Sequence, residues 1–390
     1  MSAGTAGSTL TLPDDVRSRF PVLGNLVYLN SCSQGALSDA VRSAYDEYLG
    51  SMEREGSSWD HWIERQDRVR GLLADLLGAQ ASEVAVTTSS SAGIAALASA
   101  LDFSGERNRV VTTDLEFPTI GQIWHAQERR GAEVVHVGSD SDNTIPLDRF
   151  AEAIDDRTLI VSITQVCYRN GALLDLKPVV ELAHSRGALV LVDTYQGVGA
   201  IPLDVRDLGA DFVSGGCLKY LLGSPGVGFL YARADTTAAL VPTSTGWFGA
   251  RDIWAMNIHS YDPATDARRF ESGTPPVPGL YAAAAGIELM LEIGIGRTRS
   301  HVEGLLTRLR SGVEEIGGIV VTPERLHGPM LAVATTDEHA CVAALEKDGV
   351  VVSSRDGNVR ISPHCYNDTT DIDAVLAALH THRHLLRTTH

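Results

Sequence analysis

An aspartate and a lysine, Asp193 and Lys219, are the residues of this 390-residue chain whose setting most clearly favours chemistry. Asp193 follows an apolar, β-branched run, Leu189 to Val192, that predicts a buried strand. Lys219 stands among apolar residues between two glycine-rich turns, and burial lowers the pKa of a lysine so that its free amine can attack an aldehyde. Pyridoxal phosphate, an aldehyde cofactor, needs such an amine at its carbonyl carbon and a carboxylate at its ring nitrogen. As an isolated pair, the two residues would more often mark a capped loop and a surface lysine.

The residues around this pair follow a more specific pattern than the pair itself. In chain order they are Asp193, Gln196, Gly199, Pro202, Asp204, Asp211, Lys219, Gly226 and Gly228. The segment resembles the cofactor-lysine region of class V aminotransferases, in the branch that contains cysteine desulfurases, kynureninases and isopenicillin N epimerase-like enzymes. The resemblance extends over residues 20 to 385 and implies a pyridoxal phosphate enzyme, in which Lys219 is catalytic and Asp193, Gln196 and Lys219 bind the cofactor.

A phosphate site is indicated at the start of a helix. Residues 84–88 predict a strand, and Ser89-Ser90-Ser91 lead from it into an Ala-rich helix that reaches Leu101. Free backbone N–H groups and the helix dipole favour an anion there, although a serine helix cap explains the turn equally well. The resemblance assigns the cofactor phosphate to the hydroxyls of Ser90 and Ser91.

Three aromatic residues carry a further part of the resemblance. Phe117 comes after the predicted strand Arg109 to Thr113, and Tyr168 comes after the predicted strand Leu159 to Thr164. In the resembled family Phe117 stacks on the cofactor ring, where desulfurases have histidine and kynureninases have phenylalanine. Tyr168 is expected at the substrate, at a position that is asparagine in desulfurases and tyrosine in kynureninases. Trp247 resembles the Gly-Trp element of kynureninases and is expected at the cofactor.

Arg360 lies in an apolar strand, Val359 to Ile361, where a buried guanidinium stays charged and needs an anion. A structural ion pair would meet that need as well as a ligand would. The pattern R-x-S-x-x-x-Y-N resembles the family's clamp for the substrate carboxylate, so the resemblance implies that role for Arg360. It also places Asn30 and Ser31, which follow a predicted strand ending at Leu29, beside the substrate.

A second subunit is implied at Thr274. The run Arg269-Phe270-Glu271-Ser272-Gly273-Thr274-Pro275 resembles the R-F-E-x-G-T-P element of the whole branch, whose threonine reaches the cofactor phosphate of the neighbouring subunit. We therefore expect a homodimer with active sites shared between subunits. Without the resemblance, Gly-Thr-Pro-Pro would mark only a rigid turn.

Strand and helix patterns alternate from residue 84 to 231, which predicts an α/β fold with a mostly parallel central sheet and helices on both faces. The resemblance specifies the PLP-dependent transferase fold type I. Residues 20–280 are expected to form a large cofactor-binding domain, and residues 281–390 a small C-terminal α+β domain to which the N-terminal segment contributes. Residues 1–19 are expected to be disordered or extended.

The net charge, the cysteines and the lengths of the apolar runs limit the kinds of molecule that the protein can be expected to bind. A formal net charge of −17 argues against nucleic acid, whose backbone requires a basic surface. The five cysteines are odd in number and lack C-x-x-C spacing, so neither a disulfide framework nor a metal site is indicated, and a reduced compartment suits them. Since no apolar run approaches 18 residues and the first residues have no basic stretch, we expect a cytoplasmic protein without a membrane partner.

The motifs predict which cofactor is bound, but they are less specific for the reaction that is catalysed on an amino-acid substrate. The leading hypothesis is a lyase in which Lys219 removes the Cα proton and a β-substituent leaves, foremost a thiol from cysteine or an S-conjugated cysteine. Kynureninase-like carbon–carbon cleavage is the nearest alternative; decarboxylative or oxidative deamination, transamination and epimerisation in a secondary-metabolite pathway are others. A persulfide-forming desulfurase is disfavoured, because the loop 353–358 has no cysteine and Cys217 and Cys365 lie elsewhere. A cofactor-free binding protein is a separate class, kept open because Leu218 replaces the histidine or tyrosine usual beside the lysine.

Overall fold

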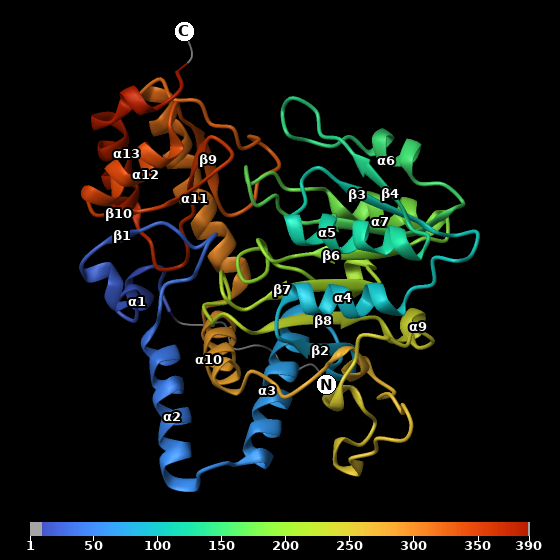
Figure 1. Ribbon diagram of the computed structural model, residues 1–390. Helices are drawn as coiled ribbons and strands as arrows, with labels where there is room; N and C mark the ends of the chain where they lie inside the picture. The colour runs from blue at the N-terminus through green and yellow to red at the C-terminus, as the bar shows by residue number, and fades with distance from the viewer. Residues whose placement is uncertain (1–9, 389–390) are drawn as a thin grey trace.

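The computed structural model describes residues 10–388, and its centre is a seven-stranded sheet (Figure 1). The strand order is β2-β8-β7-β6-β5-β3-β4. In that order the strands span Val84–Thr87, Gly228–Ala232, Phe212–Gly216, Leu189–Asp193, Thr158–Thr164, Arg109–Thr113 and Glu133–Val137. Strands β7, β6, β5, β3 and β4 are parallel, whereas β8 runs antiparallel to both β7 and β2. The predicted α/β fold with a mostly parallel sheet is confirmed.

The reversal at β8 has a local cause. A parallel neighbour requires a crossover, usually through a helix, but only residues 217–227 join β7 to β8. The chain therefore turns back at the end of β7, and this turn holds Lys219. Since the other six strands point the same way, their carboxyl ends meet at one edge of the sheet, beside the same turn.

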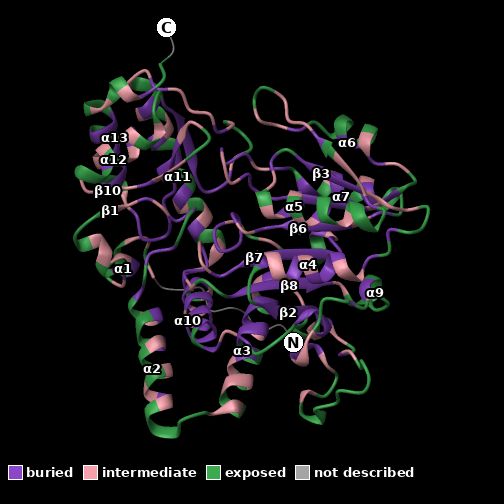
Figure 2. Ribbon diagram, in the orientation of Figure 1, coloured by how far each residue is buried: buried purple, intermediate pink, exposed green. Residues whose placement is uncertain are grey.

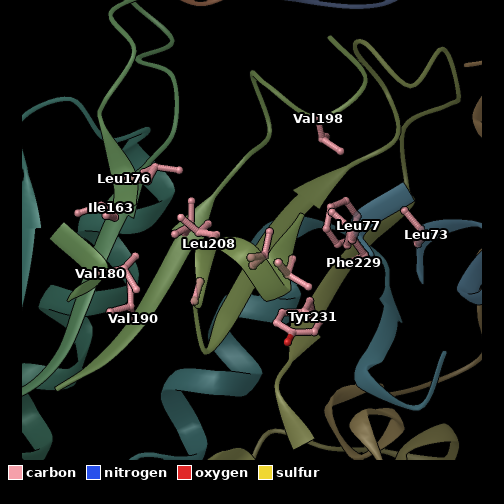
Figure 3. Packing of buried hydrophobic residues seen from close by; sticks show 14 of the residues in the cluster. Leu73, Leu77, Ile163, Leu176, Val180, Val190, Val198, Leu208, Phe229 and Tyr231 are labelled. Carbon is pink, nitrogen blue, oxygen red and sulfur yellow. The ribbon is translucent and has the colours of Figure 1, made fainter. Parts of the chain in front are cut away.

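Helices cover both faces of the sheet, because successive strand residues point to opposite sides. In β6, Val190 and Val192 face one layer of helices and Leu191 faces the other. The first layer contains α3, α6, α7, α8 and α10, which span Trp59–Leu77, Leu147–Ala153, Leu176–Ser185, Val205–Leu208 and Val277–Ile293. The second contains α4 and α5, which span Ser90–Ala100 and Pro118–Ala126. Figure 2 shows the central strands buried between these layers, and Figure 3 shows part of the first apolar cluster.

A smaller unit is built around a second, antiparallel sheet of order β11-β12-β9. Its strands span Ser353–Arg355, Asn358–Ile361 and Leu331–Ala334, and its helices α11, α12 and α13 span Ile295–Glu315, Glu338–Lys347 and Thr369–Thr381. The early strand β1 (Val27–Tyr28) pairs in parallel with β10 (Val350–Val351). Leu29 lies in the same apolar cluster as the helices of this unit. Segments from both ends of the chain therefore meet here, as Figure 1 shows.

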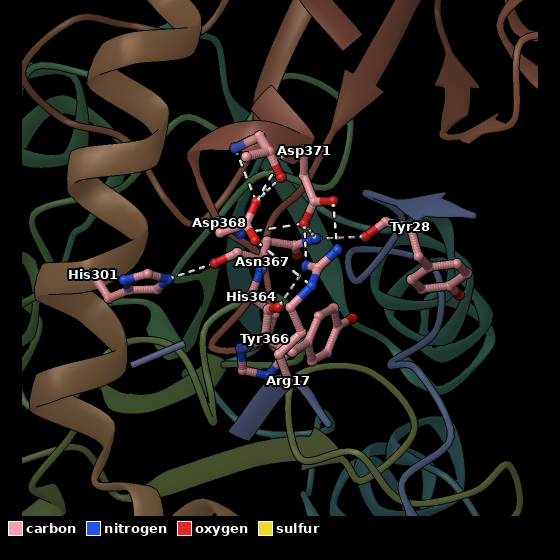
Figure 4. Close-up of polar contacts among 9 residues, drawn as sticks. Arg17, Tyr28, His301, His364, Tyr366, Asn367, Asp368 and Asp371 are labelled. Carbon is pink, nitrogen blue, oxygen red and sulfur yellow. Dashed lines mark hydrogen bonds and ion pairs between the residues drawn. The ribbon is translucent and has the colours of Figure 1, made fainter. Parts of the chain in front are cut away.

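The N-terminal residues differ in part from the expectation. Residues 1–9 lie outside the described residues, but residues 10–19, expected to be disordered or extended, include helix α1 (Asp14–Arg17). Arg17 donates hydrogen bonds to the Asp371 carboxylate at 2.6 Å and to the carbonyl oxygen of Tyr366 at 3.1 Å (Figure 4). The expectation is wrong for α1, because these contacts fix the segment to the C-terminal unit.

Helices α2 (Asp39–Glu55) and α3 form an arm that packs against α10. Helix α10 also supplies Leu280, Ala283 and Ile287 to the core of the large sheet. The boundary expected after residue 280 falls inside this helix, so we propose that the large domain ends at Ile293. Between residues 10 and 388, no single helix is both long and apolar enough to cross a membrane; α10 and α11 reach that length only as a pair bent by 76°.

Candidate active site

A cavity of about 290 Å³ lies at the edge of the sheet where the parallel strands end. Seven of the residues that line it were predicted from the sequence: Ser90, Ser91, Phe117, Tyr168, Asp193, Gln196 and Lys219. The others are Ser89, Thr119, Ile120, Thr164, Val166, Tyr195 and Leu218. The turns after β2, β3, β5, β6 and β7 all contribute, so the strand ends gather these side chains from distant parts of the sequence.

Lys219 reaches the cavity from the turn between β7 and β8, and its amine lies 4.7 Å from the centre of the Tyr195 ring. Burial lowers the pKa of this lysine to about 8, although interactions with Cys32 and Asp193 oppose the shift. An amine with this pKa is in part free of its proton at neutral pH. It can therefore act as a nucleophile or as a base.

Two distant segments hold the lysine turn in place. The Gly35 N–H donates to the carbonyl oxygen of Leu218 at 3.0 Å. A Cβ atom at Gly35 would lie 2.3 Å from the carbonyl oxygen of Lys219, so this close approach requires glycine. On the other side, Nε2 of His364 lies 2.9 Å from the carbonyl oxygen of Tyr220. Burial lowers the pKa of His364 to about 4, so a neutral imidazole donates this bond.

Asp193 ends β6 directly opposite Thr164 and Ser214 of the neighbouring strands. Its carboxylate accepts a hydrogen bond from the Tyr195 N–H at 2.9 Å, and no cation in residues 10–388 lies within ion-pair distance of it. Burial raises the pKa of Asp193, although this hydrogen bond and the charge of Lys219 oppose the shift. A buried carboxylate of this kind, on a cavity wall, suits a protonated ring nitrogen.

The first turn of α4 provides the predicted anion site. Ser89 caps the helix, because its hydroxyl accepts from a backbone N–H three residues on at 3.1 Å. The hydroxyls of Ser90 and Ser91 are left to contact those of Ser214 at 2.8 Å and Thr119 at 3.1 Å. The cap and the anion site are therefore compatible, and the N-terminal turn of the helix faces the cavity where a phosphate would be favoured.

Phe117 and Tyr168 form an aromatic wall, with ring centres 4.9 Å apart and an edge-to-face arrangement. Phe117 keeps 44% of its surface exposed, and this surface is suited to stacking on a planar ring. Glu116, which sequence reasoning missed, fixes the Phe117 loop to β5. Its carboxyl oxygen accepts from the N–H of Thr164 at 2.8 Å and from the hydroxyl of Thr113 at 2.7 Å. Burial raises the pKa of Glu116 well above its usual value.

Arg360 in β12 is buried, with 4% of its surface exposed. Its guanidinium donates to the carbonyl oxygen of Tyr168 at 2.7 Å and to the hydroxyl of Ser353 at 2.9 Å. Within residues 10–388 its Nε has no hydrogen-bond partner and the guanidinium forms no ion pair, so a structural ion pair does not account for its burial. A buried guanidinium without an internal anion suits a carboxylate ligand.

Five predicted residues do not line this cavity: Asn30, Ser31, Trp247, Thr274 and Arg360, the last of which contacts it through the carbonyl oxygen of Tyr168. Ser31 is buried and shares a 2.7 Å hydrogen bond with the hydroxyl of Tyr366. Asn30 has a buried Oδ1 with no partner among the described residues. Trp247 lines a separate cavity of about 820 Å³, and Thr274 is exposed. Their roles stay predictions.

The cavity fits pyridoxal phosphate on three independent counts. Lys219 offers a partly unprotonated amine, Asp193 offers a buried carboxylate without a cation, and the start of α4 offers N–H groups to a phosphate. Gln196 adds a buried Oε1 that has no partner among the described residues. Residues 10–388 contain no group of three or more histidine, cysteine or carboxylate side chains placed to hold a metal ion.

Comparisons with known proteins lead to the same family. A family model described as Aminotransferase class-V matches residues 31–375. The chain is 35% identical over 360 residues to the uncharacterized aminotransferase YcbU of Bacillus subtilis (strain 168), with 91% of this chain and 94% of that protein covered. It is 34% identical over 295 residues to a kynureninase of Deinococcus radiodurans, with 73% and 70% covered. A solved apo structure of a cysteine desulfurase from Thermococcus onnurineus NA1 shares the fold, with a TM-score of 0.88 at 23% identity over 96% of this chain and 98% of that one.

Proposed function

Because the chain belongs to the class-V aminotransferase family and is a pyridoxal phosphate enzyme, we propose that it is a lyase that expels a β-substituent, foremost a thiol, from cysteine or an S-conjugated cysteine. The observation that carries this proposal is a partly unprotonated amine at Lys219 in the cavity, together with a buried guanidinium at Arg360 that has no ion pair among the described residues and donates to the carbonyl oxygen of the cavity residue Tyr168. The amine can take a proton from Cα, and the guanidinium can hold the α-carboxylate.

Each side chain has a distinct role in the proposed reaction. The bound cofactor supplies a cationic ring that withdraws electrons from Cα. Asp193 would stabilise the positive charge at the ring nitrogen, and Phe117 offers an aromatic surface on which the ring could stack. Lys219 accepts the Cα proton at Nζ while Arg360 fixes the orientation of the substrate carboxylate. The electrons of the carbon–sulfur bond leave with sulfur, and the remaining three-carbon unit is hydrolysed to pyruvate and ammonia.

The hairpin before Arg360 supports a lyase over a persulfide-forming desulfurase. Strands β11 and β12 are joined by Asp356 and Gly357, both with positive φ, at 57° and 78°. A two-residue turn of this type holds its flanking strands in register. The segment 353–358 is thus a short, paired hairpin without a cysteine, whereas sulfur capture there would need a mobile thiol.

Kynureninase-like hydrolysis is the second candidate function. The aromatic wall of Phe117 and Tyr168 favours it, because an aryl ketone substrate would find stacking partners there. The 34% identity to a kynureninase over part of the chain supports the same candidate. The two functions differ in the bond that breaks, so their products separate them.

We further propose a homodimer in which a second copy covers the face around residues 245–262. Large apolar side chains are exposed together on this segment: Trp254, Met256, Ile258 and Tyr261. Such a patch is typical of a protein interface. Trp247 and Thr274, which lie outside the cavity of their own chain, would then serve the cavity of the second subunit.

Hybrid dimers test this arrangement. Lys219→Ala and Thr274→Ala subunits are each expected to form homodimers of low activity. Co-expressed, they would form hybrids with one site that has both residues intact, so activity would return towards half of the wild-type value per dimer. Hybrids no more active than either parent would contradict shared sites.

The setting proposed for the enzyme is the cytoplasm, with a free amino acid as substrate. All five cysteines are buried and unpaired, as a reducing compartment favours. The net charge of −17 also disfavours nucleic acid as a partner.

A product assay tests the function directly. The purified enzyme with added pyridoxal phosphate is incubated with cysteine, S-alkyl cysteines and kynurenine. The lyase predicts pyruvate, ammonia and a thiol in equal amounts from the sulfur substrates, and none with Lys219→Ala. Anthranilate and alanine from kynurenine would favour the second candidate. Transfer of the amino group to an added keto acid, without pyruvate, would refute the lyase.

A further inference from the structure

Cys32 is a buried residue behind the cavity wall, where its carbonyl oxygen accepts a hydrogen bond from the cavity residue Gln196, although no motif pointed to it. The loop Asn30 to Gly35 follows β1 and is fixed on both sides. The Cys32 N–H donates to the hydroxyl of Ser362 at 2.9 Å, next to β12. At the other end of the loop, the Gly35 N–H donates to the carbonyl oxygen of Leu218 at 3.0 Å. The loop is therefore pinned between the arginine strand and the lysine turn.

The sulfur of Cys32 contacts a residue that binds Arg360, the group proposed to hold the substrate carboxylate. It is 3.6 Å from the hydroxyl of Ser353, which accepts a 2.9 Å hydrogen bond from Arg360. After burial, the interaction with Cys32 has the largest effect on the pKa of Lys219, ahead of that with Asp193. The loop that carries Cys32 packs directly on the lysine turn, because the Gly35 N–H donates to the carbonyl oxygen of Leu218, the residue before Lys219.

Two buried polar atoms next to Cys32 indicate that a ligand belongs there. Gln196 donates from Nε2 to the carbonyl oxygen of Cys32 at 3.1 Å, while its Oε1 is buried and has no partner among the described residues. The buried Nε of Arg360 has none either. Buried polar groups are ordinarily paired, so both atoms are suited to a bound polar molecule.

The proposed lyase also requires a proton donor for the leaving sulfur. Phe117 stands where an imidazole would be found in desulfurases, and its ring has no proton to give. Burial raises the pKa of Tyr195 to about 12, which makes its hydroxyl a poor acid. A leaving thiolate with a high pKa needs protonation as it departs.

We propose that Cys32 is the general acid that protonates the leaving sulfur, with Lys219 restoring its proton. This inference rests on the proposed lyase function. Lys219 first takes the Cα proton, and the carbon–sulfur bond breaks with its electron pair on sulfur. The Cys32 thiol gives its proton to that sulfur, and the Lys219 ammonium then protonates the Cys32 thiolate. One proton thus passes from Cα to the leaving thiol, and both side chains return to their starting states.

Leaving groups of different basicity test this role. Pyruvate formation by wild-type enzyme and Cys32→Ala is measured with S-methylcysteine, whose thiolate is a strong base, and with β-chloroalanine, whose chloride leaves without a proton. General acid catalysis contributes about 10²- to 10⁴-fold, so Cys32→Ala should lose that factor with S-methylcysteine and stay within about threefold of wild type with β-chloroalanine. Cys32→Ser should recover part of the loss.

Two controls separate a chemical role from a structural one. Cys341→Ala removes another buried thiol, in the core of the small unit, and should leave both rates unchanged. The absorption spectrum of the bound cofactor should be the same in Cys32→Ala as in wild type.

Three results would overturn the assignment. An equal loss with both substrates would mean that Cys32 only shapes the site. No loss with either substrate would mean that another group, such as Tyr168, donates the proton. If wild-type enzyme forms pyruvate from neither substrate, the proposed lyase function itself fails, and the role of Cys32 fails with it.

Discussion

The pKa of Lys219 gives a prediction that is independent of the substrate. Burial lowers this pKa from 10.5 to about 8. At pH 7.5 about a quarter of the amine is then unprotonated, compared with about one part in a thousand for a lysine of ordinary pKa. Pyridoxal phosphate reacts with the unprotonated amine, so capture should be about two hundredfold faster than at an exposed lysine.

The perturbation is pH, applied to apoenzyme from which the cofactor has been removed. Pyridoxal phosphate is added between about pH 6 and pH 10, and the absorbance of the lysine-bound cofactor is followed by stopped flow. Below pH 8 the capture rate should rise about tenfold per pH unit, and above pH 8 it should level off. A parallel series with N-acetyl-lysine methylamide corrects for the pH dependence of the cofactor itself, and Lys219→Ala gives the background rate.

The result that would refute this reasoning is a capture rate that keeps rising to about pH 10. It would mean that Lys219 keeps the pKa of an exposed lysine, so that burial in this turn does not release its proton. A rate unaffected by Lys219→Ala would refute the assignment of the lysine itself.

Four further substitutions have defined outcomes. Asp193→Asn should still bind the cofactor but lose turnover about 10- to 100-fold, because a hydrogen bond to a charged group is worth about 1.5–3 kcal/mol. Unchanged turnover would contradict the proposed contact between Asp193 and the ring nitrogen. Arg360→Lys should raise KM more than it lowers kcat in steady-state assays, since a point charge replaces a bidentate fork; a pure loss of kcat would contradict carboxylate binding. Gly228→Ala places a Cβ 2.4 Å from the backbone at the start of α4, so this variant should lose about 1–3 kcal/mol of cofactor affinity in a fluorescence titration. Gly24→Ala is the control: its Cβ meets nothing within 4 Å, and its cofactor affinity should be unchanged. Burial raises the pKa of Glu116 in the folded chain, so the contribution of this group to stability falls as pH rises above about 4.5. Urea unfolding at several pH values should show that Glu116→Gln weakens the pH dependence in that direction.

The strand ends were the part of the fold that the sequence predicted best. Apolar β-branched runs followed by polar residues gave β3, β5 and β6, because buried parallel strands leave a continuous apolar signal. Strand β4 (Glu133–Val137) was missed, since it lies at the edge of the sheet and most of its residues are only partly buried. Helix α5 was missed because its first residue, Pro118, reads equally well as a turn.

The site could be predicted where function depends on residues within one turn, and not where it depends on packing between distant segments. Lys219 and Asp193 can be recognised from the sequence alone, because apolar residues and glycines lie close to each of them in the chain. Cys32 comes close to Lys219 only because β1 pairs with β10 and the following loop packs on the lysine turn. Glu116 looks like a surface acid in the sequence, and only the close approach of Thr164 shows that it is buried.

The most direct test of the whole account is the attachment site of the cofactor. The chain has only three lysines, Lys177, Lys219 and Lys347, and of these only Lys219 lines the cavity. Holoenzyme reduced with borohydride and digested should give one phosphopyridoxyl peptide by mass spectrometry, and that peptide should contain Lys219. A label on Lys177 or Lys347, or on no lysine, would contradict the account.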